Sequence, residues 1–293
     1  ATVNDIKQLG ELLLPLLKKG QSIYSILQSH KEIKLSEKTI YNYIENGVFQ
    51  DVGVSITAID LKRVIRRKMS KQKRHAYKPR KDSRYLIGRK YSDFLIYMEK
   101  NPDAKVVEMD TVYNDMSNGP FLQTFKFIQY DLLICIYQTV KDSIHMLDGI
   151  LLLEEILGKQ MFEKEVEVIL TDRGSEFVLA EEAERREDGT RRTRMFYCDS
   201  MASWQKGSLE NVHLLVREIC PKGCDLHALG LTSQEKANLI SIHINSYPKE
   251  KLHGKSSIQL LHFYNEEMAK RLHDFGITEI PPDEVILKPY LLK

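Results

Sequence analysis

The sequence of 293 residues has no apolar run that approaches the ~20 residues needed for a membrane-spanning helix. It also lacks the basic and apolar leader that is typical of secreted proteins. Its four cysteines form no dense framework, which is typical of a reducing, cytosolic setting. These absences predict a cytoplasmic protein that has no membrane partner.

The length exceeds that of a typical single domain, which predicts two or more folded units. An apolar fraction of 42% is enough to bury a core in each. The chain begins at Ala1 rather than at methionine, so we expect a fragment or a processed product.

The net charge of +2 conceals a strong asymmetry along the chain. Residues 1–100 hold 21 Lys and Arg against 10 Asp and Glu, whereas the remainder holds 22 against 31. The densest part, residues 62–90, has 14 basic residues and a single acid, Asp82. Such a block neutralises phosphates and predicts a nucleic-acid partner, although a solvated linker is the alternative interpretation. The predicted DNA contacts in this block are Arg63, Arg66, Arg67, Lys68, Lys71, Lys73 and Arg74.

An all-helical region precedes the basic block. Residues 5–18 and 21–29 carry apolar residues at helical spacing, and Ser36 is the predicted N-cap of a third helix that Gly47 closes. Two short helices joined by a turn indicate a DNA-binding helix-turn-helix, and the basic block favours this over a plain three-helix bundle. The residues predicted to face the DNA groove are Lys38, Thr39 and Asn42.

From residue 103 onward the pattern alternates between strands and helices. The expected strands are 105–113, 121–130, 132–140, 166–171 and 195–198, and the expected helices are 144–162, 208–219 and 233–244. Three antiparallel-type strands followed by alternating helices and strands predict an α/β domain with a mixed sheet flanked by helices. This is the order of a ribonuclease H-like fold.

Three acids stand at the ends of these elements. Asp110 lies toward the end of the first strand, Asp172 follows the fourth, and Glu210 lies one turn inside the helix 208–219. Carboxylates are the preferred ligands of hard divalent cations, and two such cations stabilise both the attacking and leaving oxygens in phosphodiester transfer. The pattern predicts a site for Mg²⁺ or Mn²⁺, with Lys206 and Arg217 as further DNA contacts near it.

Two other groups of residues have alternative interpretations. His213, Cys220, Cys224 and His227 could form a zinc site, but their spacing matches no common zinc pattern and buried apolar cysteines are the better interpretation. The charge-rich segment 181–194 is expected to be a solvated face. Its basic residues Arg191, Arg192 and Arg194 are alternative DNA contacts.

Several motifs resemble the insertion sequence 30 family of bacterial transposases, in its Firmicute-like branch. They are VVEMDTV around Asp110, VILTDRGSEF around Asp172 and QKGSLEN around Glu210. SEKTIYNYIENGVF is similar to that family's helix-turn-helix, and HINSYPKEKL and PPDEVILKPYLLK extend the resemblance over almost the whole chain. Arg173, where the family more often has Asn, and Ser208–Leu209 depart from the pattern without removing an acid.

The resemblance implies a DDE transposase with a retroviral integrase-type core. Its metal-binding and catalytic acids would be Asp110, Asp172 and Glu210, with two Mg²⁺ or Mn²⁺ ions per site. The enzyme would cut transposon ends and join the freed 3′-hydroxyl directly to target DNA. Joining two ends requires at least a homodimer on double-stranded DNA, carrying terminal inverted repeats, in the bacterial cytoplasm at the nucleoid.

The resemblance also implies a division of the chain. We expect a helix-turn-helix region at 1–50, a basic DNA-contacting linker at 51–100, a catalytic domain at 101–265 and a tail at 266–293. The family usually carries further DNA-binding sequence at its N-terminus, so a segment that recognises the terminal repeats is expected to be missing. The alternatives are a catalytically silent, domesticated DNA-binding protein and a metal-dependent nuclease without strand transfer.

Overall fold

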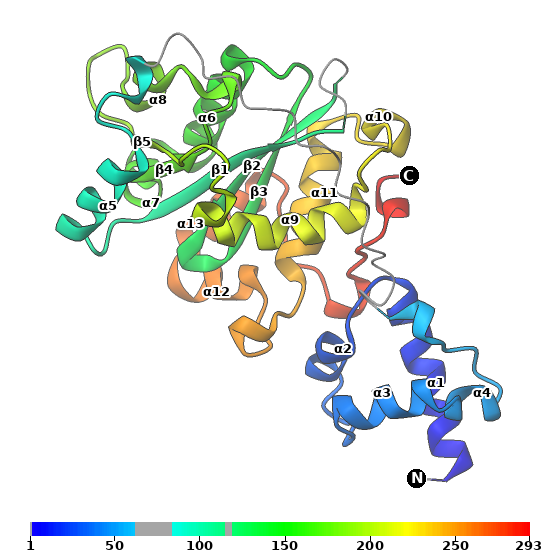
Figure 1. Cartoon of the computed structure of the whole chain (residues 1–293). Coiled ribbons are helices and arrows are strands. Elements are labelled where there is room, and N and C mark those ends of the chain that lie inside the picture. The colour runs from blue at the N-terminus through cyan, green and yellow to red at the C-terminus, as the bar shows by residue number, and fades with distance from the viewer. Residues whose placement is uncertain (1, 62–83, 115–118) are drawn as a thin grey trace.

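The computed structural model describes residues 2–61, 84–114 and 119–293. A small helical unit at the N-terminus is followed by a larger α/β body (Figure 1). The predicted DNA contacts Arg63, Arg66, Arg67, Lys68, Lys71, Lys73 and Arg74 lie outside the described residues. None of the helices within the described ranges is long and apolar enough to cross a membrane.

The N-terminal unit is built from four helices around one apolar core. They are α1 (Val3–Lys18), α2 (Ile23–Ser29), α3 (Glu37–Glu45) and α4 (Val48–Asp51). Leu13, Ile40 and Phe49 are fully buried where these helices meet. The predicted cap is confirmed, because the Ser36 hydroxyl accepts a hydrogen bond from the amide three residues on, at 3.1 Å. Gly47 follows α3 with φ +71°, the left-handed conformation that favours glycine at a helix end.

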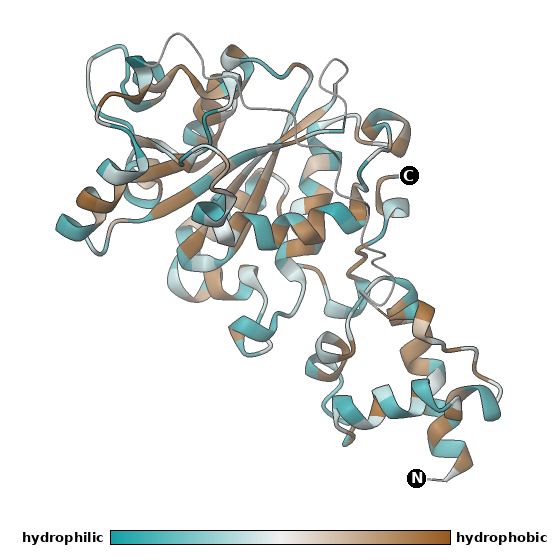
Figure 2. Cartoon of the chain, viewed as in Figure 1, coloured by the Kyte–Doolittle hydropathy of each residue, from teal (hydrophilic) through white to brown (hydrophobic). Residues whose placement is uncertain are grey.

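The helices α2 and α3 follow one another along the chain with residues 30–36 between them, and a DNA-binding helix-turn-helix there stays a prediction. Lys38 and Asn42 are exposed on α3, and Thr39 is half-buried with its hydroxyl bonded to Ser36 at 2.9 Å. Figure 2 shows α3 as mostly hydrophilic along its visible side. The predicted groove-facing side is therefore largely available to a partner, and DNA contact there stays a prediction.

Five strands form the sheet of the body. They are β1 (Val106–Val112), β2 (Phe121–Phe127), β3 (Leu132–Gln138), β4 (Val168–Thr171) and β5 (Arg194–Tyr197). Their spatial order is β3-β2-β1-β4-β5, with β2 antiparallel to both neighbours and β1, β4 and β5 parallel to one another. This order and these directions confirm the mixed α/β, ribonuclease H-like fold that the sequence predicts.

Helices cover both faces of the sheet (Figure 1). One face packs against α6 (Ser143–Leu157), α7 (Lys159–Glu165), α8 (Ala180–Glu184), α12 (Ser257–Tyr264) and α13 (Glu266–Asp274). The other packs against α5 (Tyr91–Lys100), α9 (Gly207–Ile219), α10 (Leu226–Leu229) and α11 (Gln234–Ser246).

Two details of the helical layers differ from the expected pattern. The expected helix 144–162 is divided into α6 and α7 because Gly158 adopts φ +73° between them. The boundaries at residues 100 and 265 stay predictions, although α5 and α13 lie beyond them and pack against the sheet.

The outer edge of β3 is covered by side chains of α11. Asn245 bonds both the amide and the carbonyl of Leu133, at 2.9 and 2.7 Å. Ser241 accepts from the amide of Cys135, and Gln234 donates to its carbonyl. These bonds satisfy backbone groups that would otherwise invite pairing with another chain, so the sheet ends at β3.

The C-terminal tail attaches the N-terminal unit to the body. The Gln21 amide donates to the carbonyls of Pro282 and Val285, at 2.9 and 3.0 Å. The amide of Leu287 donates to the carbonyl of Lys19 at 2.8 Å. The N-terminal unit is thus bonded to the body by residues more than 260 positions away in the sequence.

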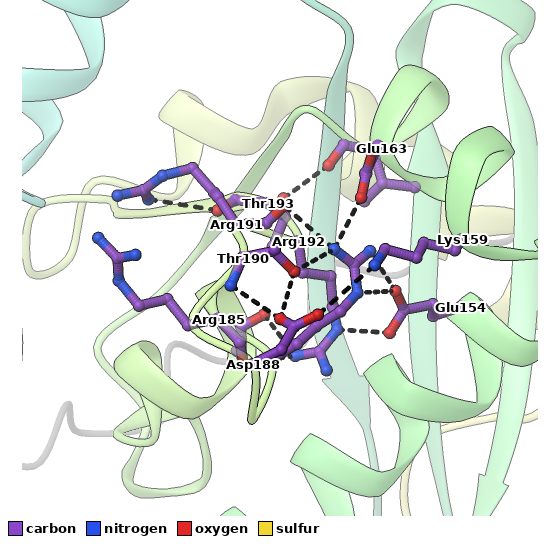
Figure 3. A network of polar contacts seen from close by, with 12 residues as sticks. Glu154, Lys159, Glu163, Arg185, Asp188, Thr190, Arg191, Arg192 and Thr193 are labelled. Atoms are coloured by element: carbon purple, nitrogen blue, oxygen red, sulfur yellow. Dashed lines mark hydrogen bonds and ion pairs between the residues drawn. The ribbon is translucent and has the colours of Figure 1, made fainter.

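The charge-rich segment 181–194 is solvated only in part. Glu181, Glu187 and Asp188 are among its exposed residues, as expected, whereas Glu184 and Arg192 are buried. Arg192 is only 7% exposed, and its guanidinium donates to Glu154 on α6 at 2.6 Å and to backbone carbonyls (Figure 3). Arg186 also pairs with Glu154, and with Glu163 at 2.7 Å. Ion pairs with acids of α6 and α7 therefore hold the segment against the body.

The other two basic candidates in this segment have contacts within the protein too. Arg191 lies 3.6 Å from the carboxylate of Glu184, and the guanidinium of Arg194 stacks over the ring of Tyr97 at 4.9 Å. A DNA contact by any of the three stays a prediction.

Candidate active site

Parallel pairing of β1 with β4 brings two of the predicted acids together. The register places Glu108 opposite Leu170, and the same offset carries Asp110 opposite Asp172 just beyond β4. Because side chains alternate between the faces of a sheet, both carboxylates lie on the face that α9 covers. Burial raises the pKa of Asp172, and the neighbouring Asp110 carboxylate adds to the rise against the opposing charge of Lys206.

Lys206 places a positive charge between these two acids. It is 4% exposed, and its ammonium donates to the Asp110 carboxylate at 2.9 Å and to the carbonyl of Met109 at 3.3 Å. Burial opposes its ionisation, but the charges of Asp110 and Asp172 raise the pKa of Lys206 overall. The predicted DNA contact by Lys206 is untested; its ammonium points into the acid site.

Backbone amides orient both carboxylates. Asp110 accepts from the amide of Thr111, and Asp172 accepts from the amide of Gly174, each at 2.7 Å. A Cβ atom at position 174 would come within 2.8 Å of the Asp172 carboxylate. The glycine therefore lets the chain turn tightly around this acid.

Glu108 fixes the start of α9 to the sheet. It is 4% exposed, and its carboxylate accepts from the amide of Leu209 at 2.5 Å, in the first turn of that helix. Burial raises the pKa of Glu108, against the opposing effect of this hydrogen bond. Sequence reasoning missed its role, although a second acid two residues before Asp110 falls on the same face of the strand.

The third predicted acid, Glu210, stands apart from the other two. Its side chain is exposed on the first turn of α9, one residue beyond the amide held by Glu108. Within the described part of the chain, no three His, Cys, Asp or Glu side chains are close enough together to hold a metal ion. The structure thus brings together Asp110 and Asp172 and leaves Glu210 outside bonding range of that pair.

The residues present fit a divalent cation. Two carboxylates on one sheet face share a single ammonium, so negative charge exceeds positive charge at this point. The Asp110 side chain is 27% exposed, so its carboxylate remains open to solvent. Oxygen donors of this kind suit Mg²⁺ or Mn²⁺.

His213 and Arg217 complete the α9 side of the site. The Thr124 hydroxyl donates to the carbonyl of Asp110 at 3.0 Å, so the His213 ring nitrogen 2.9 Å away donates to that hydroxyl. Burial lowers the pKa of His213 to about 4, which keeps it neutral near pH 7. Arg217 donates to Asn114 at 2.6 Å and to the carbonyl of residue 113 at 3.0 Å.

These contacts bear on two of the sequence interpretations. The guanidinium of Arg217 is engaged within the protein, and a DNA contact by it is untested. Of the residues in the alternative zinc set, His213 bonds Thr124, whereas Cys220 is buried in the apolar core beneath α9.

No protein-family model matches the chain. A stretch of 68 residues is 37% identical to the transposase for insertion sequence element IS1086 of Cupriavidus metallidurans. That match covers 23% of this chain and 19% of the transposase, so the chain matches about a fifth of the length of this curated relative.

Two similar solved structures are forms of the HTLV-2 integrase catalytic core domain in complex with magnesium. The trimeric form has a TM-score of 0.34 and 15% identity, and covers 53% of this chain and 94% of that one. The dimeric form has a TM-score of 0.33 and 17% identity, and covers 54% and 94%. Superpositions with such scores are loose, so the fold assignment rests on the strand order and directions.

Proposed function

We propose that the protein is a DDE transposase of the insertion sequence 30 family, in its Firmicute-like branch. It would cleave transposon DNA ends and join them to target DNA in a metal-dependent reaction. The observation that carries this proposal is the in-register pair of Asp110 and Asp172, with Glu210 on the helix that covers them. The 68-residue similarity to a transposase supports the same class of activity.

Asp110, Asp172 and Glu210 would hold two Mg²⁺ or Mn²⁺ ions. When bound, such ions polarise the phosphodiester and stabilise the charge that develops on its oxygens. The backbone amides at residues 111 and 174 orient the two strand-end acids for this purpose. Glu210 has to approach them, and Glu108 anchors the helical turn from which it would do so.

Lys206 links the acid pair to the position of Glu210. Its ammonium neutralises part of the charge of Asp110 and Asp172, and cations bound there would compete with it. Because α9 begins at the next residue, a movement of the first turn of α9 toward the acids would also move Lys206. We therefore expect Lys206 to release Asp110 when the acids bind ions.

The proposed partner is double-stranded DNA, both as transposon terminal inverted repeats and as target. Lys38, Thr39 and Asn42 would enter the groove from α3, and the basic residues between 63 and 74 would contact phosphates. Two ends have to be joined in one reaction, so at least a homodimer would assemble on the DNA.

Joining of a labelled, pre-cleaved transposon end to plasmid DNA in Mg²⁺ or Mn²⁺ tests this function. The parent protein should be compared with Asp172→Asn and Glu210→Gln, and with Glu155→Gln as the matched control. Glu155 is an exposed acid of α6, on the opposite side of the sheet. We expect joined product from the parent and the control alone.

The two alternative functions give different results in the same assay. Cleavage without joined product would favour a metal-dependent nuclease. DNA binding with neither cleavage nor joining, in either metal, would favour a silent DNA-binding protein. Equal joining by all four proteins would show that Asp172 and Glu210 are not needed for the reaction.

A further inference from the structure

The loop that connects β5 to α9, residues 198–206, buries two of its polar residues and exposes two of its apolar ones. Its polar residues Gln205 and Lys206 are 9% and 4% exposed, whereas Met201 and Trp204 are 70% and 71% exposed. Met201 also has φ +63°, a left-handed conformation that a bulky side chain rarely adopts. Single exposed apolar side chains are common, but a loop that buries an ammonium while it exposes an indole is a candidate contact surface.

The loop is bonded beside the acids at both ends, and its contact with Arg173 does not depend on Lys206. Lys206 bonds Asp110 at one end of it. At the other end, the Asp199 carboxylate accepts from Arg173 at 2.8 Å and from the Gln205 amide at 3.1 Å. Since Arg173 directly follows Asp172, the loop is tied to both acid-bearing segments, and Trp204 is carried at the border of the site.

An aromatic side chain from another element supports Trp204. Tyr91, the first residue of α5, meets the indole edge-to-face, with ring centroids 6.3 Å apart at 76°. Phe94 packs behind Tyr91 at 5.5 Å. The indole is thus braced from one side and open to solvent on the rest of its surface.

We propose that Trp204, supported by Tyr91, forms a stacking platform for an unpaired DNA base next to the phosphodiester processed at Asp110 and Asp172. The proposal rests on the proposed function and names a contact within it. Every base has an aromatic face, so such stacking is independent of sequence. It would hold the strand end in line with the acids while the adjoining base pair is open.

The size and place of the platform favour a base over a protein partner. A stable protein interface covers about 800 Å² on each side, which far exceeds one indole and the edge of a phenol ring. The platform also lies only two residues from Lys206, whose ammonium reaches the acid pair. A nucleotide attached to a phosphodiester at that pair would therefore be within reach of Trp204.

Intrinsic fluorescence tests the proposal directly, because Trp204 is the single tryptophan of the 293-residue sequence. The whole protein is titrated with three labelled DNA duplexes: one with three unpaired nucleotides at one 3′ end, one with the same overhang made abasic, and one blunt. Binding is followed separately by anisotropy of the DNA label. We expect strong quenching of Trp204 by the overhang with bases, and little by the other two.

Variants separate stacking from a general effect on folding. Trp204→Ala should bind the overhang duplex about tenfold more weakly and the blunt duplex unchanged. Trp204→Phe should keep the preference, reported by 2-aminopurine placed in the overhang. Phe263→Ala is the control, because Phe263 is an 82% exposed aromatic residue of α12, which packs on the opposite face of the sheet.

Three outcomes would overturn the platform. They are equal quenching by the abasic overhang, unchanged binding of the overhang by Trp204→Ala, and quenching that depends on protein concentration without DNA. The last would assign Trp204 to self-association. Absence of DNA binding by anisotropy would overturn the proposed function as well, whereas DNA binding without base-dependent quenching would overturn the platform alone.

Discussion

Two clusters of buried charge in the same sheet have opposite compositions. At the acid site, Asp110 and Asp172 share one ammonium, that of Lys206. In the turn between β2 and β3, three ammonium groups surround the single carboxylate of Asp131. They belong to Lys126, Lys249 and Lys251.

The clusters differ in how far their carboxylates are paired with positive groups of the protein itself. The Asp131 carboxylate is 6% exposed, and Lys126 and Lys249 also donate to its backbone carbonyl. Despite burial, the lysines hold the pKa of Asp131 far below its ordinary value, so the cluster is closed. At the acid site, Asp110 is 27% exposed and the pKa of Asp172 is raised. Buried charge alone is therefore a poor criterion for a candidate site, and an open cluster with an excess of one sign is a better one.

Removal of one negative charge from the acid site should have the largest effect on activity. Asp172→Asn should lower the rate of DNA joining by about 10³-fold, the loss of several kcal/mol of transition-state stabilisation. The melting temperature should stay equal or rise, because the substitution removes a desolvated carboxylate repelled by Asp110. Joining kinetics and thermal unfolding of the same preparation measure both. A loss of activity that merely follows a loss of stability would contradict the assignment.

In the Asp131 cluster, removal of the carboxylate charge should lower stability instead. Asp131→Asn should lower the free energy of unfolding by about 3–5 kcal/mol, because it leaves two buried ammonium groups without a counter-charge. Denaturant unfolding measures this, with Glu155→Gln as an exposed control. A change below about 1 kcal/mol would show that the lysines are neutral or rearrange.

The tail that joins the two units should loosen in acid through His243. Its Nδ1 accepts from the amide of Ile286 at 2.9 Å, and burial lowers the pKa of His243 from 6.5 to about 4. The unfolded chain binds this proton first, so the stabilisation is complete above pH 6.5 and is lost as the pH falls toward 4. The slope is about 1.4 kcal/mol per pH unit in that window. The free energy of unfolding of His243→Gln, measured from pH 7 to 5, should fall less steeply than that of the parent. An equal slope in both proteins would contradict the assignment.

His30 should give the smallest effect and the opposite sign. Although burial opposes it, hydrogen bonds to Glu32 and Asp283 raise the pKa of His30. Its contribution is therefore fully present below pH 6.5 and is lost as the pH rises through the raised value. Both carboxylates are more than half exposed, so the effect should be well below that of His243. The contribution of His30 is measured by the free energy of unfolding of the parent and of His30→Gln at pH 6 and pH 8. An identical change between the two pH values in both proteins would refute it.

Local patterns in the sequence predict the sheet, and with it the closeness of Asp110 and Asp172. Alternating apolar residues mark β1 and β4, and a carboxylate at each strand end falls where parallel pairing brings such ends together. The helix caps at Ser36 and Gly47 also depend on neighbouring residues alone. Such features follow from interactions over a few positions, which the sequence displays directly.

The errors concern interactions between distant positions. Segment 181–194 is solvated along only part of its length, because Arg192 finds its partner Glu154 38 positions away. Lys206 becomes buried only because the start of α9 lies over β1, 96 positions from Asp110. Glu108 in turn holds the first turn of α9 from 101 positions away. No local pattern shows these pairings, because packing of the whole domain creates them.

Calorimetric titration with Mn²⁺ tests the central claim most directly, since it requires neither DNA nor turnover. The account predicts saturable binding to the parent and to Glu155→Gln, and loss of that binding in Asp110→Asn and Asp172→Asn. Glu210→Gln should weaken it, because that acid has to join the pair. Binding of equal affinity and stoichiometry to all five proteins, or to none, would contradict the assignment of Asp110 and Asp172 as a metal site.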